Sequence, residues 1–258
     1  VELCSIEDDL SRRDFTINSI AASLMKDNFG EIYDPFSGIK DLQKNILITP
    51  LDPDTTFMDD PLRILRAVRF SAQLNFNLTP VIEQSIIKQK HGLDFISKER
   101  ITEEIIKILK ADKPSIGFHL LKKLDLLPLV FPELDTLGGI EVIDGHGHKD
   151  VFLHTLEVVD NAAKKTKKMK IRFAALLHDI AKPQTKRFYK GKGWTYYGHE
   201  ELGQYIIKKI AKRMKLSNDL RDYLMLLTKL HLRPIALAKD GVSDSAVRRV
   251  MHEAGEHI

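Results

Sequence analysis

The sequence contains a single cysteine, Cys4, among its 258 residues. One thiol cannot form an internal disulfide framework, and its isolation suits a reducing compartment. No apolar run approaches the length of a membrane span and no signal peptide is recognisable, so we expect a cytoplasmic location and no membrane partner. Because the chain begins at Val1 without a methionine and ends just after a helical pattern, RRVMHEAGEHI, we also expect it to be a piece of a longer protein.

A strong excess of one charge is also missing, since 40 Lys and Arg residues face 36 Asp and Glu residues for a formal net charge of +4. That total is too small to indicate a nucleic-acid partner, and the distribution of charge is more informative. Basic runs occupy Lys164–Lys170, Lys186–Trp194 and Lys208–Lys215. Each run alone is typical of a solvated helix face or loop, whereas the three together indicate a partner with a phosphate backbone.

The segment Ile171–Pro183, IRFAALLHDIAKP, places a histidine beside an aspartate near the end of an apolar helical pattern. Pro183 is predicted to end that helix, because proline cannot continue the hydrogen-bond ladder. His178 offers an imidazole nitrogen and Asp179 a carboxylate oxygen, a mixed set that zinc, iron, manganese or nickel accepts. Lys182 falls on the same side as Asp179, where it can hold an anionic group.

Other histidines accompany this pair. His154, His199 and His231 each introduce or interrupt an amphipathic helical segment. A histidine near a helix end is more often a cap or a hydrogen-bonded core group, and a single His-Asp dipeptide is weak evidence of a metal site. Several such histidines on different helices can instead converge on one site inside a bundle.

The order of these residues resembles the HD superfamily of metal-dependent phosphohydrolases, which is named after the dyad. The resemblance implies a helical domain from about Lys149 onward, in which a metal polarises a phosphate and activates water. In that superfamily the last ligand is usually an aspartate, whereas the matching segment here, KLHLRP, holds His231 and Leu232. The predicted metal ligands are His154, His178, Asp179, His199 and His231, and the predicted catalytic residues are His178, Asp179 and Lys182.

The first half of the chain gives few strand signals. A helix is predicted within SRRDFTINSIAASLM, and short strands are predicted at Glu31–Tyr33 and Ile46–Thr49 around a turn at Pro35–Gly38. From Pro61 onward the pattern is almost entirely helical. The glycine-rich stretch GGIEVIDGHGHKD is the predicted linker between the two halves.

The segment FMDDPLRILRAVRF predicts a helix that presents arginines beside acidic residues. A proline in the first turn and acidic residues at the N-terminus both favour this helix. An amphipathic helix with a solvated arginine face would give the same pattern. A functional alternative is that Asp60 accepts and Arg63 donates hydrogen bonds at the edge of a nucleobase, or that the arginines hold phosphate.

Four motifs in order, RRDFTIN, DPFSGIKDL, DDPLRILRAVRF and SKERITEE, resemble bacterial tRNA nucleotidyltransferases and poly(A) polymerases, with the HD-like region behind them. The resemblance implies that Asp60 and Arg63 pair with the base of CTP or ATP, and that Arg100 and Glu103 belong to a structural Arg/Glu motif in the neck. The residues it places in the nucleotide site are Arg12, Arg13, Asp14, Asn18, Asp60, Arg63 and Arg66.

The family's catalytic magnesium ions are held by two aspartates in a strand upstream of the RRDFT motif. Asp52 and Asp54 have a similar spacing here, but Pro53 disfavours a central strand and LDPDTT is predicted to be a loop. Without the two-metal clamp, this segment is expected to bind nucleotides weakly and not to add them.

The predicted fold is mainly α-helical, with a remnant of an α/β nucleotidyltransferase head that carries a short β-hairpin, a helical neck and body, and a helical HD domain. The expected domains are 1–56, 57–137 and 138–258. The predicted function is nucleotide transfer from CTP or ATP to the 3′ end of tRNA with Mg²⁺, joined to an HD phosphohydrolase that uses Ni²⁺, Mn²⁺, Zn²⁺ or Fe. The alternatives are a stand-alone HD phosphohydrolase acting on phosphomonoesters, cyclic phosphates or nucleotides, and a non-catalytic RNA-binding helical module.

Overall fold

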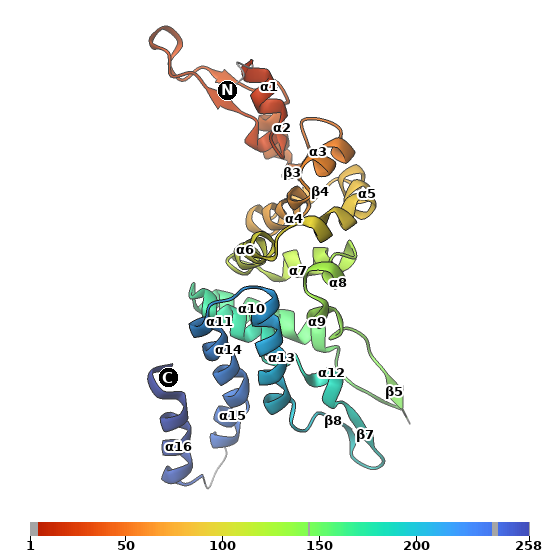
Figure 1. Ribbon diagram of the computed structural model, residues 1–258, viewed down its shortest axis with the longest axis vertical. Coiled ribbons are helices and arrows are strands. Elements are labelled where there is room, and N and C mark those ends of the chain that lie inside the picture. Colours follow the sequence, from red (N-terminus) through yellow and green to blue (C-terminus); the bar gives the residue numbers. More distant parts are fainter. Residues whose placement is uncertain (1–4, 144, 239–241, 258) are drawn as a thin grey trace. The chain divides into compact units, whose positions relative to one another are not determined.

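The computed structural model describes residues 5–143, 145–238 and 242–257, and most of them are helical (Figure 1). The chain divides into two compact units, Val1–Val130 and Phe131–Ile258. The prediction of a mainly helical fold with few short strands is confirmed. No helix in the described residues is long and apolar enough to cross a membrane.

The first unit begins with short elements. They are α1 (Ile6–Ser11), η1 (Thr16–Asn18), β1 (Ala21–Ala22), η2 (Lys26–Asn28), β2 (Ile32–Tyr33), α2 (Gly38–Lys44) and β3 (Ile46–Leu47). A capping box starts α1, because the Ser5 hydroxyl accepts from the Asp8 amide and the Asp8 carboxylate accepts from the Ser5 amide. Strands β1 and β2 pair antiparallel and form the hairpin.

The helix predicted within residues 11–25 is wrong, since this stretch forms η1 and β1 after an extended Phe15. Tertiary contacts explain the difference. The Thr16 amide donates to the Ile48 carbonyl at 2.8 Å, and the Thr16 hydroxyl donates to the buried Asp41 carboxylate at 2.7 Å. A Cβ on Gly38 would lie only 2.2 Å from the Thr16 carbonyl oxygen, so glycine permits α2 to approach this turn.

The two predicted strands exist, but they do not pair with each other. β2 pairs with β1, whereas β3 pairs in parallel with β4 (Asn77–Leu78). The predicted loop at LDPDTT is also wrong, because α3 (Pro53–Asp59) begins there. The Asp52 carboxylate caps the Thr55 amide and Pro53 occupies the first turn, where a missing N–H has no consequence.

The rest of the first unit is a helical bundle. It contains α4 (Leu62–Leu74), α5 (Pro80–Gln89), η3 (Lys90–Phe95), α6 (Lys98–Leu109), α7 (Ser115–Lys123) and α8 (Leu127–Val130). Helix α4 packs on α6 and α7 through fully buried residues that include Leu65, Ile108 and Phe118. Gly117 permits the close approach of α7, because a Cβ there would lie 2.5 Å from the Ile108 side chain.

A buried ion pair joins α4 to α6. Arg69 Nε lies 2.8 Å from the Glu104 carboxylate, and their side chains are 11% and 2% exposed. Lys107 Nζ approaches the other oxygen of Glu104 at 2.8 Å. Of the two residues in the expected Arg/Glu motif of the neck, Arg100 contacts Asp60, and Glu103 is exposed.

The second unit is also a helical bundle, with two short hairpins. Its elements are α9 (Pro132–Asp135), β5 (Val142–Ile143), β6 (His146–Gly147), α10 (Val151–Lys165), α11 (Met169–Leu177), α12 (Lys182–Thr185), β7 (Arg187–Tyr189), β8 (Gly193–Thr195), α13 (His199–Arg213), α14 (Asn218–Leu230), α15 (Arg233–Leu237), α16 (Asp244–Ala254) and η4 (Gly255–His257). Helix α11 packs between α10 and α14, and α13 packs along α14.

Two features hold these helices close together. Gly203 on α13 faces α14, where a Cβ would lie 2.7 Å from the Thr228 methyl group. Arg172 on α11 is fully buried, and its guanidinium donates to the carbonyls of Ala163 and Thr166 at the end of α10. These bonds satisfy carbonyls that lack a partner at a helix C-terminus.

The end of α11 differs from the sequence prediction. The helix ends at Leu177, before the His-Asp pair, and Pro183 lies in the first turn of α12. A proline is favourable at the start of a helix, so it opens α12 rather than terminating α11. His178 and Asp179 therefore lie at the junction of two helices.

We expect Glu104→Ala to destabilise the first unit by about 3–5 kcal/mol, because it leaves Arg69 buried without its partner. Glu103→Ala, on the exposed side of the same helix, should change the stability by less than about 0.5 kcal/mol. Urea unfolding followed by far-UV circular dichroism reports both units. The only tryptophan, Trp194, lies in the second unit, so its fluorescence reports that unit alone. Equal effects of the two substitutions would contradict the role of the ion pair.

Candidate metal centre and nucleotide pocket

Asp179 is the centre of the polar cluster in the second unit. It is the second residue after α11, and only 1% of its surface is exposed. Around it lie His154 from α10, His178 at the end of α11, His199 at the start of α13 and His231 at the end of α14. The structure thus brings together all the histidines that the sequence predicted to converge.

The two carboxylate oxygens of Asp179 face different partners. Oδ2 lies 3.0 Å from His178 Nε2, 3.8 Å from His154 Nε2 and 2.6 Å from Lys182 Nζ. Oδ1 lies 3.3 Å from His199 Nε2 and 3.7 Å from His231 Nε2. Each oxygen therefore belongs to its own group of imidazole nitrogens.

Three of the imidazole rings are oriented by the backbone. His178 Nδ1 lies 2.8 Å from the Ala175 carbonyl, His199 Nδ1 lies 2.7 Å from the Tyr196 carbonyl, and His231 Nδ1 lies 2.6 Å from the Thr228 carbonyl. A carbonyl only accepts, so each Nδ1 carries the proton and donates. In the neutral ring, Nε2 then holds a lone pair that points toward Asp179, as in histidines that bind metals.

Charges in the cluster shift the pKa values of its members. Burial alone would raise the pKa of Asp179, but when His178, His199 and His231 are protonated their hydrogen bonds to the carboxylate hold that pKa well below its usual range. Burial lowers the pKa of His154. The pKa of His199 is raised, because its contacts with Asp179 and the Tyr196 carbonyl outweigh its burial.

The donor set fits a divalent metal. Two overlapping groups have ligand atoms that lie within 4.8 Å of one another, namely His154, His178 and Asp179, and Asp179, His199 and His231. Asp179 Oδ2 is buried and accepts no hydrogen bond of good geometry from the described residues, although Lys182 Nζ is close. Imidazole nitrogens around an ionised, unsatisfied carboxylate are the ligands that Zn²⁺, Mn²⁺, Ni²⁺ or Fe²⁺ accepts.

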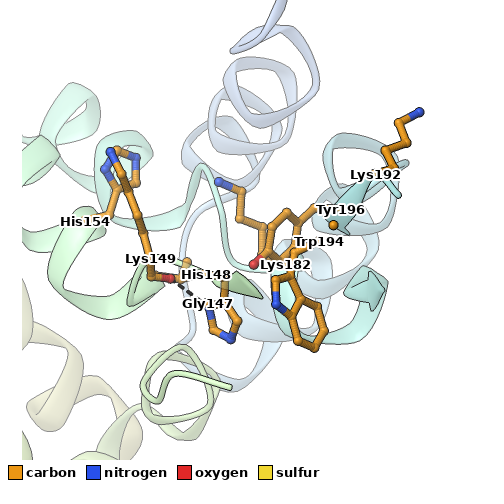
Figure 2. A pocket seen from close by; sticks show the side chains of 10 residues that line it. Gly147, His148, Lys149, His154, Lys182, Lys192, Trp194 and Tyr196 are labelled. Atoms are coloured by element: carbon orange, nitrogen blue, oxygen red, sulfur yellow. Dashed lines mark hydrogen bonds between the residues drawn. The ribbon is translucent and has the colours of Figure 1, made fainter. Parts of the chain in front are cut away.

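A cleft of about 450 Å³ opens beside this cluster, and both hairpins of the second unit contribute to it (Figure 2). His154 and Lys182 lie on one part of its wall, and Trp194 and Tyr196 come from β8 and the residues after it. Lys182 Nζ lies 5.4 Å from the centre of the Tyr196 ring. The cleft therefore offers cationic and aromatic groups next to the candidate metal ligands.

Sequence patterns did not predict this aromatic wall. The basic run Lys186–Trp194 was expected to be a solvated face or loop, whereas it forms most of the β7–β8 hairpin. The alternation of aromatic residues in FYKGKGWTYY, with glycines at its centre, is the signal that could have identified a hairpin. Lys186 lies 3.0 Å from His148 Nε2 and stacks over Trp194.

A second pocket of about 460 Å³ lies in the first unit and is almost entirely charged. The residues that line it are Arg13, Asp14, Asn18, Asp60, Leu62, Arg63, Arg66 and Arg100. Six of the seven predicted nucleotide-site residues are thus together. The exception is Arg12, whose side chain is exposed and does not line the pocket.

Hydrogen bonds fix the polar groups of this pocket. The buried Asp14 accepts from Arg66 at 2.7 Å and from Asn18 at 3.0 Å. Asp60 accepts from the Leu62 amide at the start of α4, and Arg100 Nη2 lies 3.2 Å from its carboxylate. Arg100 was expected to be purely structural, so its place in the pocket is a finding of the structure.

Arg63 is held by backbone groups. Its guanidinium donates to the Thr56 carbonyl at 3.2 Å and to the Arg12 carbonyl at 2.5 Å. These bonds join α3 and the segment after α1 to α4. They also occupy some of the Arg63 N–H groups that were expected to donate to the edge of a nucleobase.

The fold and these two sites define a helical protein with a charged ligand pocket in one unit and an HD-type candidate metal centre in the other. Three family models match the chain. The poly(A) polymerase head domain matches residues 1–48, a probable RNA- and SrmB-binding site of polymerase A matches residues 75–137, and the HD domain matches residues 151–254.

Curated relatives match across nearly the whole chain. The multifunctional CCA protein of Tolumonas auensis is 36% identical over 251 residues, which cover 91% of this chain and 58% of the relative. That of Shewanella frigidimarina is 36% identical over 234 residues, with 88% and 54% covered. The chain therefore spans a little over half the length of these relatives.

Solved structures share the fold. A tRNA nucleotidyltransferase complexed with a primer tRNA and an incoming ATP analogue has a TM-score of 0.66 at 22% identity, covering 99% of this chain and 68% of that one. A tRNA-processing enzyme with CTP has a TM-score of 0.65 at 23% identity, with 96% and 61% covered. The chain belongs to the tRNA nucleotidyltransferase and poly(A) polymerase family, and it carries an HD domain.

We expect Asp179→Ala to abolish tight binding of divalent metal, because it removes the one ligand shared by both candidate groups. Elemental analysis after equilibration with Mn²⁺ measures the loss, and circular dichroism checks that the helices remain. Asp219→Ala, an exposed aspartate in the first turn of α14, is the matched control and should retain the metal. Metal retained at full stoichiometry by Asp179→Ala would refute the assignment.

Proposed function

We propose that this chain is the nucleotide-selecting and HD part of an enzyme that transfers nucleotides from CTP or ATP to the 3′ end of tRNA with Mg²⁺. The observation that carries the proposal is the charged pocket of the first unit, where four arginines and two aspartates meet. Curated relatives over nearly the whole chain are multifunctional CCA proteins, which supports the same function. We propose that the chain comprises a head remnant at 1–56, a neck and RNA-binding region at 57–137, and an HD domain at 138–258. The proposed location is the cytoplasm.

Each group in the charged pocket has a role that follows from its contacts. Asp60 presents a carboxylate that can accept from the exocyclic amine of cytosine or adenine, and Arg100 beside it orients that carboxylate. Arg66, held by Asp14, presents the rest of its guanidinium to a triphosphate. Arg63 keeps the backbone around the pocket in place and can still donate from its remaining N–H groups.

We propose that the HD domain hydrolyses phosphate esters with a divalent ion such as Ni²⁺, Mn²⁺, Zn²⁺ or Fe²⁺. The bound metal would polarise a phosphoryl oxygen and make water a better nucleophile at neutral pH. The chain supplies the rest. His154, His178, Asp179, His199 and His231 hold the metal, and Lys182 lines the cleft next to Asp179, where its charge can bind a phosphate oxygen.

The aromatic wall of the cleft indicates that the ester carries a nucleoside. Trp194 and Tyr196 lie across from His154 in the same cleft, and aromatic rings stack on bases of any sequence. The phosphorylated end of an RNA, or a free nucleotide, fits a cleft that combines such rings with lysines. The basic runs Lys164–Lys170 and Lys208–Lys215 are proposed contacts for the tRNA backbone.

We predict that Arg66→Ala weakens the binding of both CTP and ATP to this chain by about tenfold or more, because it removes a charge-assisted contact with phosphate worth about 1.5–3 kcal/mol. Isothermal titration of each nucleotide measures the effect. Arg248→Ala removes the same charge from an exposed position in the other unit and should leave the affinity unchanged. Identical affinities in the two variants would contradict the assignment of the pocket.

We predict that Lys182→Ala lowers kcat/KM for a generic phosphomonoester about ten- to hundredfold in the presence of Mn²⁺ or Ni²⁺, the scale of one contact to a charged phosphate oxygen. Lys192 lies at the exposed rim of the same cleft, so Lys192→Ala should change the rate by less than threefold. Steady-state kinetics measures kcat/KM for both variants. A larger effect at Lys192 than at Lys182 would mean that Lys182 does not bind the phosphate.

A further inference from the structure

A second cavity lies beside the cleft of Figure 2, and we call that cleft the first cavity. The second cavity has a volume of about 460 Å³ and shares four lining residues with the first, namely Lys182, Lys192, Trp194 and Tyr196. Strand β8 and the residues after it therefore border two adjoining cavities. Each cavity is large enough for a ligand of its own, since ligand pockets begin at about 300 Å³.

The two cavities reach the Asp179 cluster from different sides. His154, which approaches Oδ2 of Asp179, lines the first cavity, whereas His199, which approaches Oδ1, lines the second. Lys182 lines both cavities, and its ammonium group lies 2.6 Å from Oδ2. A phosphate group bound beside Lys182 can therefore carry one substituent into each cavity.

Aromatic rings border both cavities. Trp194 and Tyr196 line the two of them, and Tyr197 lines the second alone. The Tyr197 residue is 66% exposed, so its ring is accessible for stacking. Bases of any sequence stack on aromatic side chains. The two cavities can thus hold two bases, whereas a single nucleotide would occupy only one of them.

Contacts between the two hairpins of this unit hold the aromatic residues in place. Lys186 Nζ lies 2.7 Å from the Glu141 carboxylate, 3.0 Å from His148 Nε2 and 4.7 Å from the centre of the Trp194 ring. The His148 ring also meets Trp194 edge to face, with 5.2 Å between the ring centres. The stacking surface is therefore formed before a ligand binds, which reduces the entropy lost on binding.

The charges of the two cavities differ. Lys149 lines the first cavity in addition to the two shared lysines, and no acidic residue is among the described residues that line it. The second cavity adds no further lysine and includes Glu200. A carboxylate repels a second phosphate, but it can accept hydrogen bonds from the hydroxyls of a ribose. The first cavity therefore suits a strand that carries further phosphates, and the second suits a terminal nucleoside.

We propose that the HD domain hydrolyses the phosphodiester between the last two nucleosides of an RNA strand. The terminal nucleoside lies in the second cavity, the preceding nucleoside lies in the first, and the phosphate that joins them lies beside Lys182. This substrate rests on the proposed function of the HD domain as a phosphohydrolase and specifies the ester that it cleaves.

The reaction is a hydrolysis without a redox step. The oxygen of a water molecule bonds to phosphorus, and the bond between phosphorus and the 5′ oxygen of the terminal nucleoside breaks. One proton of the water ends on that 5′ oxygen and the other passes to solvent. The products are a free nucleoside and a strand with a 3′ phosphomonoester. The new dianion then lies on the side with three lysines, and the uncharged product lies on the side of Glu200.

Two diesters of equal charge test the proposal. The dinucleoside monophosphate ApA fills both cavities, whereas adenosine 3′-(methyl phosphate) lacks the second nucleoside, and hydrolysis of either releases adenosine 3′-phosphate. With Mn²⁺ supplied, we expect kcat/KM of the wild-type chain to be at least about fivefold higher for ApA, the lower end of the effect of one stacked base. Chromatography of the initial products measures both rates.

Variants of Tyr197 test the assignment of the second cavity. Tyr197→Ala should reduce the ratio of the two kcat/KM values about five- to hundredfold, toward one, and Tyr197→Phe, which keeps the ring, should restore it. Tyr205→Ala removes a tyrosine of α13 that is also exposed but lines neither cavity, so the ratio should stay at the wild-type value.

Other outcomes overturn the proposal. Equal kcat/KM values of the wild-type chain for the two diesters would refute the second nucleoside cavity while leaving a phosphohydrolase intact. The same conclusion follows if the chain hydrolyses a generic phosphomonoester and neither diester. An unchanged ratio in Tyr197→Ala would refute the assigned stacking residue. A chain that hydrolyses none of these esters with Mn²⁺ or Ni²⁺ would contradict the proposed hydrolase function as well.

Discussion

The second unit is built around a buried carboxylate that has to stay ionised. Removing a carboxylate from water costs several kcal/mol unless partners compensate, and Asp179 is almost fully buried. The Lys182 ammonium group, 2.6 Å from Oδ2, compensates part of this cost, and the other groups around the carboxylate come from the termini of separate helices, since His178 ends α11, His199 begins α13 and His231 ends α14. The packing of α11 between α10 and α14 and the close approach of α13 at Gly203 bring those ends to one point. The stability of this arrangement and its capacity to bind a cation therefore have the same origin.

The first unit uses charges differently. Its pocket is polar, and its arginines are ordered by aspartates and by backbone carbonyls before any ligand arrives. A site whose donors are already oriented loses less entropy when it binds a triphosphate. Asp14 and Asp60 keep the arginines in place, and they also prevent the site from being a uniformly positive surface that would hold any anion.

Much of the metal centre could be predicted from the sequence. The His-Asp pair and the position of each remaining histidine at the edge of an amphipathic segment were sufficient to predict their convergence, which the structure shows. The division of the cluster into two groups could not be predicted, because it depends on which carboxylate oxygen each ring faces. The same limit applies to Arg63, whose bonds to carbonyls 7 and 51 residues away follow from tertiary packing. The helix predicted around Thr16 was wrong because tertiary hydrogen bonds determine the backbone there. The loop predicted at α3 was wrong because Asp52 and Pro53 together start a helix.

The most direct test of the metal centre is anomalous X-ray scattering from crystals of this chain grown with Mn²⁺. The candidate ligand groups predict an anomalous peak within coordination distance of the Asp179 carboxylate, beside imidazole nitrogens of the histidines that surround it. An Asp179 carboxylate without any anomalous peak within coordination distance, in crystals equilibrated with excess Mn²⁺, would contradict the account.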